Sequence, residues 1–342
     1  MPKFQKNLVI LLMRWYNIYN VWFWAVKRSN MDYIIQEKWN GISIKNVILC
    51  ELGYSTRALK ELKFIENGIK LNGEHAIVTQ TVSKGDVLSL ATEVFETPSE
   101  KLTPTPISLS IVYEDSFIVV PNKPAGMPTH TSHGHTNDTV ANALAYKYAS
   151  ENKPFVFRAI SRLDKDTSGI LIIAKTRLAA SFLSDAMKQR KIKKSYIALL
   201  EGTFEQDDEG EIESYIRRAN ESIIFRETCS KDEGGDYAKT LYKVIARCNT
   251  HTLVIASPVT GRTHQLRVHF SSLGNSIVGD ELYGSGSALS LAGLALHSYN
   301  VKFPHPSGES MELRAPIPED LKALCCSIFG ESIDKKFKDL FE

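Results

Sequence analysis

The polar stretch "SRLDKDTSG", residues 161–169, contains side chains that could do chemistry. Arg162, Asp164, Lys165 and Asp166 crowd a short loop just before a continuous apolar run. A carboxylate in such a loop is held by a rigid element and stays reachable by a substrate. Asp164 can therefore serve as a nucleophile or as a general base. An acidic side chain that only satisfies loop amides would explain the same pattern.

A second candidate segment is "GRTHQLRVHF", residues 261–270. Gly261 allows close backbone approach, and Arg262 stands where a helix is expected to begin. An arginine placed beside a carboxylate favours the ionised form of that carboxylate. The alternative is a surface arginine that pairs with RNA or faces solvent.

A third segment, "KQRKIKKSYIALLEG", combines basic residues with an aromatic one. Five of the seven residues from Lys188 to Lys194 are basic, and Tyr196 follows on an expected strand. Aromatic side chains beside cations are a common arrangement for binding bases and phosphates. A solvated loop followed by a core tyrosine is the other interpretation of this segment.

The composition limits the class of protein that can carry these segments. The chain has 342 residues, 43% of them hydrophobic and 23% charged, which excludes wholesale disorder, collagen and coiled coil. Its length suggests about two domains. The net charge is only +2, so any nucleic acid must be bound by local patches. Five cysteines without a CxxC pair indicate reduced thiols and a cytoplasmic protein.

The first thirty residues differ from the rest of the chain, because they hold three of the four tryptophans, five basic residues and no acidic one. Their apolar runs are shorter than the ~20 residues that a membrane span needs. No small-residue cleavage site follows them, which weakens a signal-peptide interpretation. We interpret residues 1–30 as an extension that precedes a natural start at Met31, with an interfacial helix as the alternative.

Residues 31–98 read as a small separate module. Ser55 or Thr56 is expected to cap a helix that Gly68 ends. Asn72-Gly73 predicts a tight turn between strands at 69–71 and 76–79, and a last strand follows at 87–90. The proline-rich residues 99–106 are expected to form a linker.

Residues 107–342 alternate between short strands and a few helices, which predicts an α+β domain with a mixed or antiparallel sheet. Helices are expected at 138–150, capped by Asn137 or Asp138, at 177–189 and at 263–274. Strands are expected at 107–115, 116–124, 169–175, 195–202, 242–246, 252–259 and 294–306.

Six short blocks occur in a fixed order along this second domain: "NKPAGM", "SRLDKDTSG", "KSYIALLEG", "GRTHQLRVH", "VGDELYG" and "LALH". Over about residues 107–320 the chain resembles the RluA/RluD-type RNA pseudouridine synthases. The segment with Ser55-Thr56-Arg57, Leu71-Asn72-Gly73 and the "VSKGDVLSL" ending resembles an S4-type RNA-binding module.

The resemblance implies roles for the residues singled out above. Asp164 would be the catalytic aspartate, Arg262 the arginine that pairs with it, and Tyr196 the ring that stacks on the target uracil. Arg162 would enter the RNA stack as the uridine leaves it. The reaction breaks the N1–C1′ bond, turns the uracil and rejoins it through C5, and the family uses no metal or organic cofactor. Ser161 stands where the family usually has histidine.

The implied substrate is RNA, most simply large-subunit ribosomal RNA, with transfer RNA as the alternative. The expected RNA contacts besides Arg162 are Arg57, Lys60, Lys63, Lys188, Arg190, Lys191, Lys193 and Lys194. We expect a monomer with no membrane partner. A non-catalytic RNA-binding or ribosome-assembly protein is a rival interpretation. A glycoside hydrolase is another, with Asp166 as the only close second acid.

Overall fold

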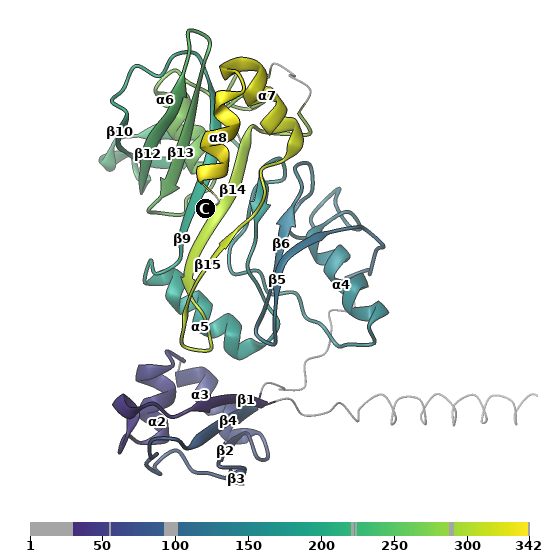
Figure 1. Cartoon of the computed structure of the whole chain (residues 1–342), viewed down its shortest axis with the longest axis vertical. Coiled ribbons are helices and arrows are strands. Elements are labelled where there is room, and N and C mark those ends of the chain that lie inside the picture. Colours follow the sequence, from purple (N-terminus) through teal and green to yellow (C-terminus); the bar gives the residue numbers. More distant parts are fainter. Residues whose placement is uncertain are drawn as a thin grey trace, which may run out of the picture. The chain divides into compact units, whose positions relative to one another are not determined.

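The computed structural model describes residues 30–54, 56–91, 102–219, 222, 224–286 and 291–340 (Figure 1). The described residues fall into two compact units, one within 1–45 and 60–94 and the other within 46–59 and 95–342. No helix in these described ranges has both the length and the apolar character needed to cross a bilayer. The expected extension, residues 1–30, lies outside the described residues except for Asn30.

The N-terminal region contains a four-stranded antiparallel sheet. Its strands are β1 (Asn30–Ile34), β2 (Ile69–Leu71), β3 (Glu74–His75) and β4 (Val87–Ala91), in the order β1-β4-β2-β3. Asn72 and Gly73 both have positive φ, 53° and 86°, so the β2–β3 turn is the tight turn that the sequence predicts. The strand expected at 76–79 is wrong, because Gln80 closes a turn by accepting from the Ile77 amide at 2.7 Å.

Short helical segments accompany this sheet. The longest is α3 (Thr56–Phe64), which carries Lys60 and Lys63 as expected. Ser55, the alternative helix cap, and the side chain of Arg57 lie outside the described residues. The others are a 3₁₀ turn (Glu37–Trp39), α2 (Ile44–Asn46) and a π-helical turn (Val47–Glu51).

The larger part of the chain is built around a mixed sheet of eleven strands among the described residues. The sheet order is β11-β10-β12-β13-β9-β14-β7-β6-β5, with β15 added to β14 and β8 to β6 (Figure 1). Its strands are β5 (Ser110–Glu114), β6 (Ile118–Lys123), β7 (Ser168–Ile170), β8 (Ile173–Ala174), β9 (Lys193–Glu201), β10 (Glu209–Arg218), β11 (Arg226–Cys229), β12 (Asp236–Arg247), β13 (His251–Pro258), β14 (Leu296–Pro304) and β15 (Ser310–Arg314). Only the β7–β14 pair is parallel among the pairs described here.

Helices cover the sheet and bury its centre on both faces. Five consecutive residues of β9, from Tyr196 to Leu200, are buried, which an alternating half-exposed strand would not allow. Leu183 and Ala186 of α5 pack with Ile170 and Val301, while the other helices join the main core. The helices are α4 (Val140–Ser150), α5 (Arg177–Lys188), α6 (Gln265–Ser272), α7 (Glu319–Phe329) and α8 (Ser332–Asp339), with a 3₁₀ turn at Lys231–Glu233.

The predicted α+β class with a mixed sheet is confirmed, although some boundaries differ. Thr139, rather than Asn137 or Asp138, caps α4, because its hydroxyl accepts from the Asn142 amide in a reciprocal capping box. The run expected as one strand at 169–175 is two short strands. The Leu171 amide donates to the Pro121 carbonyl in the register of the β6 ladder, but Pro121 has no N–H to donate in return, so the ladder is interrupted there.

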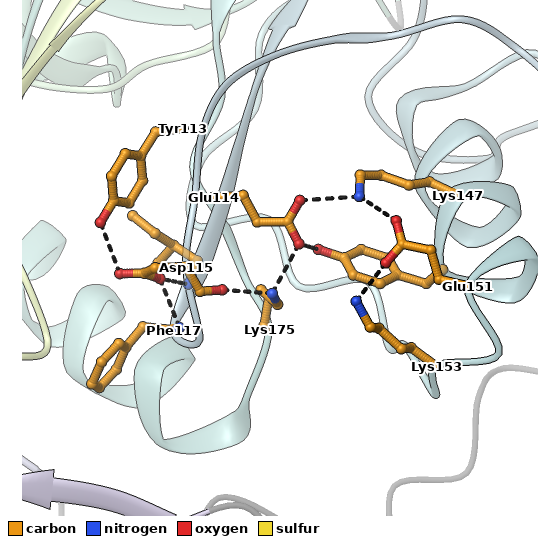
Figure 2. Close-up of polar contacts among 10 residues, drawn as sticks. Tyr113, Glu114, Asp115, Phe117, Lys147, Glu151, Lys153 and Lys175 are labelled. Carbon is orange, nitrogen blue, oxygen red and sulfur yellow. Dashed lines mark hydrogen bonds and ion pairs between the residues drawn. The ribbon is translucent and has the colours of Figure 1, made fainter.

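A polar network joins α4 to the hairpin of β5 and β6 (Figure 2). Glu114 accepts from Tyr148 at 2.7 Å and from Lys175 at 2.9 Å, and Lys147 lies 3.1 Å from its second oxygen. Although burial raises the pKa of Glu114, the hydrogen bonds from Lys175, Tyr148 and Lys147 lower it to about 2. These bonds tie the outer strands to the helix that covers them.

Gly169 of β7 lies directly against the backbone of β14, where a larger residue has no room. It has φ of +115°, and a Cβ there would lie 2.3 Å from the Ser298 carbonyl oxygen of the parallel neighbour β14. We expect Gly169→Ala to lower the free energy of unfolding by ~2–3 kcal/mol, measured by urea denaturation. Gly261→Ala is the matched control, because a Cβ at residue 261 meets nothing within 4 Å. Equal stability of the two variants would contradict the expectation.

Candidate active site

A pocket of about 490 Å³ opens where the three chemically promising segments of the sequence meet. It is lined by the loop before β7, by the end of α5 and the start of β9, and by the turn before α6. The sequence-predicted residues that line it are Arg162, Asp164, Lys188, Arg190, Lys194, Tyr196 and Arg262. The fold therefore brings together residues that lie about a hundred positions apart in the sequence.

The loop that carries Asp164 is fixed from below by a fully buried lysine. Lys123, from the end of β6, donates to the carbonyl oxygens of Pro124, Met127 and Lys165 at 3.0, 2.7 and 2.7 Å. Burial lowers the pKa of Lys123 to about 7, although the negative charges of Asp166 and Asp164 raise it in part. Three carbonyls match the three N–H donors of an ammonium group, so the bonds hold the loop in one conformation.

Asp164 presents its carboxylate to the pocket, with 34% of the side chain exposed. Its backbone oxygen accepts from the Thr167 amide at 3.2 Å, which closes the turn before β7. Two nitrogen atoms approach the same carboxylate oxygen, Oδ2. Arg267 Nη1 lies 3.8 Å away and His264 Nε2 lies 3.9 Å away.

Arg267 is held rigidly beside Asp164 by a second, buried carboxylate. Its Nε and Nη2 atoms donate to Asp280 at 2.8 and 2.7 Å, and Asp280 is fully buried. Asp280 also accepts from the Leu282 and Tyr283 amides, both at 3.0 Å. Burial lowers the pKa of Arg267, but its hydrogen bonds to Asp280 and the negative charges of Asp280 and Asp164 raise the pKa above its usual value. The guanidinium group is therefore a fixed positive charge at the pocket.

Two polar side chains of α6 fix the orientation of this helix through hydrogen bonds to the sheet. Gln265 Nε2 donates to the Lys239 carbonyl at 2.9 Å, and its Oε1 accepts from the Arg262 amide at 3.0 Å. One turn later His269 contacts Thr240 and Ser214, both at 3.0 Å. These bonds explain why Gln and His stand at these positions of the motif.

The pairing expected between Arg262 and Asp164 requires correction. Arg262 lies in the turn before α6, where its Nε donates to the Tyr237 carbonyl at 3.1 Å and its Nη1 lies 3.5 Å from Asp236. The helix begins only at Gln265, so Arg262 is directed toward the start of β12. Arg267, five positions later, is the arginine beside Asp164.

Tyr196 lines the pocket from β9, and its side chain is buried. Burial raises the pKa of Tyr196, and the charge of Asp164 raises it further, so the phenol stays neutral. A neutral ring in a fixed position can stack on a base.

Lys194 is the most buried of the predicted basic residues. Its ammonium group contacts the hydroxyl of Ser161, the residue that replaces the histidine usual in the resembling family. Burial lowers the pKa of Lys194 to about 8. The serine thus has a structural partner inside the pocket, and the lysine places a positive charge near Arg162.

The other predicted RNA contacts are spread more widely. Arg162 and Arg190 are exposed at the pocket, and Arg190 adopts a left-handed conformation with φ of 56°. Lys188 pairs with Asp185 at 3.0 Å. Lys191 and Lys193 are exposed but do not line the pocket, and Lys60 and Lys63 lie on α3.

The residues at or below the pocket that were not predicted from the sequence include Lys123, His264, Gln265, Arg267, Asp280 and Tyr283. Each lies inside one of the quoted motif blocks, so the blocks indicated the segments that form the pocket even where they did not indicate the individual residue. The ring of Tyr283 lies under the guanidinium of Arg267 at 4.9 Å, an arrangement that the spacing of the blocks could not indicate.

Comparisons with known proteins identify the family of the chain. Residues 117–272 match the family model described as RNA pseudouridylate synthase. The chain is 38% identical to the uncharacterized RNA pseudouridine synthase YjbO of Bacillus subtilis over 275 residues, which cover 80% of this chain and 95% of that protein. It is 33% identical to the ribosomal large subunit pseudouridine synthase D of Xanthomonas campestris, over 84% of this chain and 89% of the relative.

A solved structure gives the same result. The human RNA pseudouridylate synthase domain containing 1 matches with 29% identity and a TM-score of 0.52, over 65% of this chain and 87% of that one. The order of the blocks, the pocket and these relatives lead to one conclusion. The chain belongs to the RNA pseudouridine synthase family and is a pseudouridine synthase.

Proposed function

We propose that this enzyme isomerises specific uridines in large-subunit ribosomal RNA, with Asp164 as the catalytic carboxylate. The observation that carries the proposal is the placement of Asp164 in a pocket between Arg267, at 3.8 Å, and a buried aromatic ring, Tyr196. The reaction breaks the N1–C1′ bond and forms a C5–C1′ bond, while C5 loses a proton and N1 gains one, so it needs a charge that acts on the ribose and a surface that retains the uracil.

The target uridine must leave its stack before C1′ becomes accessible, which costs a few kcal/mol. Arg162 is exposed at the rim of the pocket and can fill the gap left in the RNA. We propose this role for Arg162. Stacking of the released base on Tyr196 contributes ~1–3 kcal/mol and keeps the uracil in place while it turns.

Asp164 must be ionised to act, either by attacking C1′ or by removing the C2′ proton. Arg267 supplies a fixed positive charge near Oδ2, and its bidentate bond to Asp280 keeps that charge in place. A preorganised charge of this kind acts on the reacting groups without reorganisation during the reaction. Either route uses the same residues.

The choice of ribosomal RNA rests on relatives. Proteins named ribosomal large subunit pseudouridine synthase D, from Xanthomonas campestris and Vibrio cholerae, are both 33% identical to this chain. The basic residues at the pocket, Lys188, Arg190 and Lys194, suit an RNA backbone. We propose further RNA contacts at Lys191 and Lys193 and, in the S4-like module, at Arg57, Lys60 and Lys63. We also propose that the enzyme acts in the cytoplasm.

The experiment that tests the substrate is pseudouridine mapping of total RNA in the parent strain and in a strain that lacks this gene. We expect one or more large-subunit ribosomal uridines to lose the modification and to regain it when the chain is restored. Loss confined to transfer RNA would replace the proposed substrate by transfer RNA. An unchanged map would contradict the proposal.

Lys194 makes RNA binding depend on pH. Because burial lowers its pKa to about 8, the side chain is charged at pH 7 and largely neutral at pH 9. We expect the affinity for a large-subunit ribosomal RNA transcript to fall across this range. Lys194→Met should weaken binding about tenfold at pH 7 and flatten the dependence, measured by filter binding.

The control for this prediction is Lys243→Met. Lys243 is exposed on β12 and pairs with Glu209, so its loss should leave the pH dependence unchanged. An identical pH dependence in Lys194→Met and in the parent enzyme would show that another group is responsible.

A further inference from the structure

His264 is held in an unusual conformation at the edge of the pocket. It precedes α6 with φ of 58°, in the left-handed region that residues other than glycine seldom adopt. Its side chain is only 11% exposed and lines the same pocket as Asp164. Backbone strain of this kind persists only where the surrounding structure enforces it, and it is concentrated at functional sites.

The hydroxyl of Tyr283 favours one tautomer of the His264 ring. The Arg226 amide donates to the Tyr283 oxygen at 2.9 Å, and the same oxygen lies 2.8 Å from His264 Nδ1. Since an amide can only donate, the Tyr283 oxygen accepts there and its own proton is available to Nδ1. His264 Nδ1 then accepts, which leaves the ring proton on Nε2.

Nε2, the nitrogen that carries this proton, lies near the carboxylate of Asp164. His264 Nε2 lies 3.9 Å from Oδ2 of Asp164, and Arg267 Nη1 lies 3.8 Å from the same oxygen. Burial lowers the pKa of His264, and the positive charges of Arg267 and Arg226 lower it further. The negative charges of Asp164 and Asp280 raise it, but the pKa stays below its usual value, so the ring is neutral. Two donors thus converge on Oδ2, which leaves Oδ1 for the nucleotide. Such contacts commonly shorten when substrate fills the site.

We propose that His264, fixed as the Nε2–H form by Tyr283, is a positioning residue that orients Asp164 through Oδ2 so that Oδ1 faces the ribose. This inference rests on the proposed role of Asp164. It adds a function for a histidine and a tyrosine that sequence reasoning had not used, and it explains why the strained backbone at residue 264 is retained.

The test compares two amides at residue 264. In His264→Gln the amide nitrogen is as many bonds from Cα as Nε2 is, so the donor toward Asp164 is kept. In His264→Asn the nitrogen reaches only the position of Nδ1, although asparagine suits the left-handed backbone better. We expect kcat to fall on the order of 10- to 100-fold in His264→Asn and to be largely retained in His264→Gln, with KM little changed in both.

The readout is tritium release from a large-subunit ribosomal RNA transcript labelled at C5 of uridine, with the melting temperature of each variant measured alongside. Tyr283→Phe keeps the ring under Arg267 but removes the hydroxyl. It should lower kcat several-fold in the parent enzyme and have no further effect in His264→Gln, whose donor does not depend on a ring tautomer.

The outcomes separate this inference from the proposed function. Parent-level kcat in His264→Asn, together with an inactive Asp164→Asn, would overturn the role of His264 and leave that of Asp164 intact. Equal losses in folded His264→Asn and His264→Gln would also overturn it. Full activity of Asp164→Asn would overturn the proposed catalytic carboxylate and the positioning role with it.

Discussion

Asp164→Asn is expected to abolish pseudouridine formation, with kcat reduced by about 10⁴-fold or more, because the amide can neither attack C1′ nor remove the C2′ proton. The substitution keeps the size and shape of the side chain, so the loop held by Lys123 should stay in place. Binding of the RNA should change little, since Asp164 makes no favourable contact with phosphate. The measurement is tritium release from C5-labelled transcript under single-turnover conditions, with RNA affinity determined separately.

Asp166→Asn is the matched control, because Asp166 lies two positions away in the same loop and does not line the pocket. We expect it to keep kcat within a few-fold of the parent enzyme. A large and equal loss of kcat in both variants would mean that catalysis depends on the total negative charge of the loop and not on Asp164 in particular. Undiminished turnover by Asp164→Asn would require a different catalytic group.

Asp280→Asn is expected to cause the largest loss of stability. Asp280 is fully buried and accounts for both close hydrogen bonds of Arg267, a side chain that is itself only 9% exposed. Removing one charge of a buried pair leaves the other uncompensated, which costs about 3–5 kcal/mol. We expect that decrease in the free energy of unfolding by urea, together with a loss of kcat, because Arg267 would no longer be fixed beside Asp164.

Asp208→Asn serves as the comparison for this loss. Asp208 pairs with Arg247 at 2.5 Å, but 77% of its side chain is exposed. Exposed ion pairs contribute less than about 1 kcal/mol, so this variant should unfold close to the parent enzyme. If Asp280→Asn had a urea midpoint similar to that of the parent enzyme, water or another group would have to satisfy Arg267 in place of the carboxylate.

The sequence predicted which segments meet, but not which side chain of a segment reaches the carboxylate. Both Arg262 and Arg267 belong to one ten-residue motif, and Arg262 was chosen from its place at the expected helix start and from the family resemblance. The structure begins the helix at Gln265 instead, since Gln265 bonds back to the Arg262 amide and His264 turns left-handed. The helix starts two residues later than expected, and Arg267 rather than Arg262 lies beside Asp164.

Other elements were missed for a different reason. The strand β10 reads "EGEIESYIRR", and its charged residues face solvent on an outer part of the sheet, so its hydrophobic pattern is weak. The strands β11 and β15 and the helices α7 and α8 were likewise not predicted. By contrast, β9, β13 and β14 were predicted, because their apolar runs leave few alternatives, whereas only residues 242–246 of β12 were predicted.

The position of β14 between β9 and β7 has a consequence for how the enzyme is made. Ser298 of β14 is in register with Tyr196 on one side and with Gly169, five residues after Asp164, on the other. The contact of Ser168 with His297 spans 129 positions of the chain. Contacts of such long sequence separation form late in folding. A nascent chain still short of residue 296 has no strand to set Tyr196 beside the Asp164 loop. The active site can therefore assemble only after residues 296–304 have been synthesised, and the pairing of β14 with β9 and β7 is the step that brings Tyr196 and the Asp164 loop together.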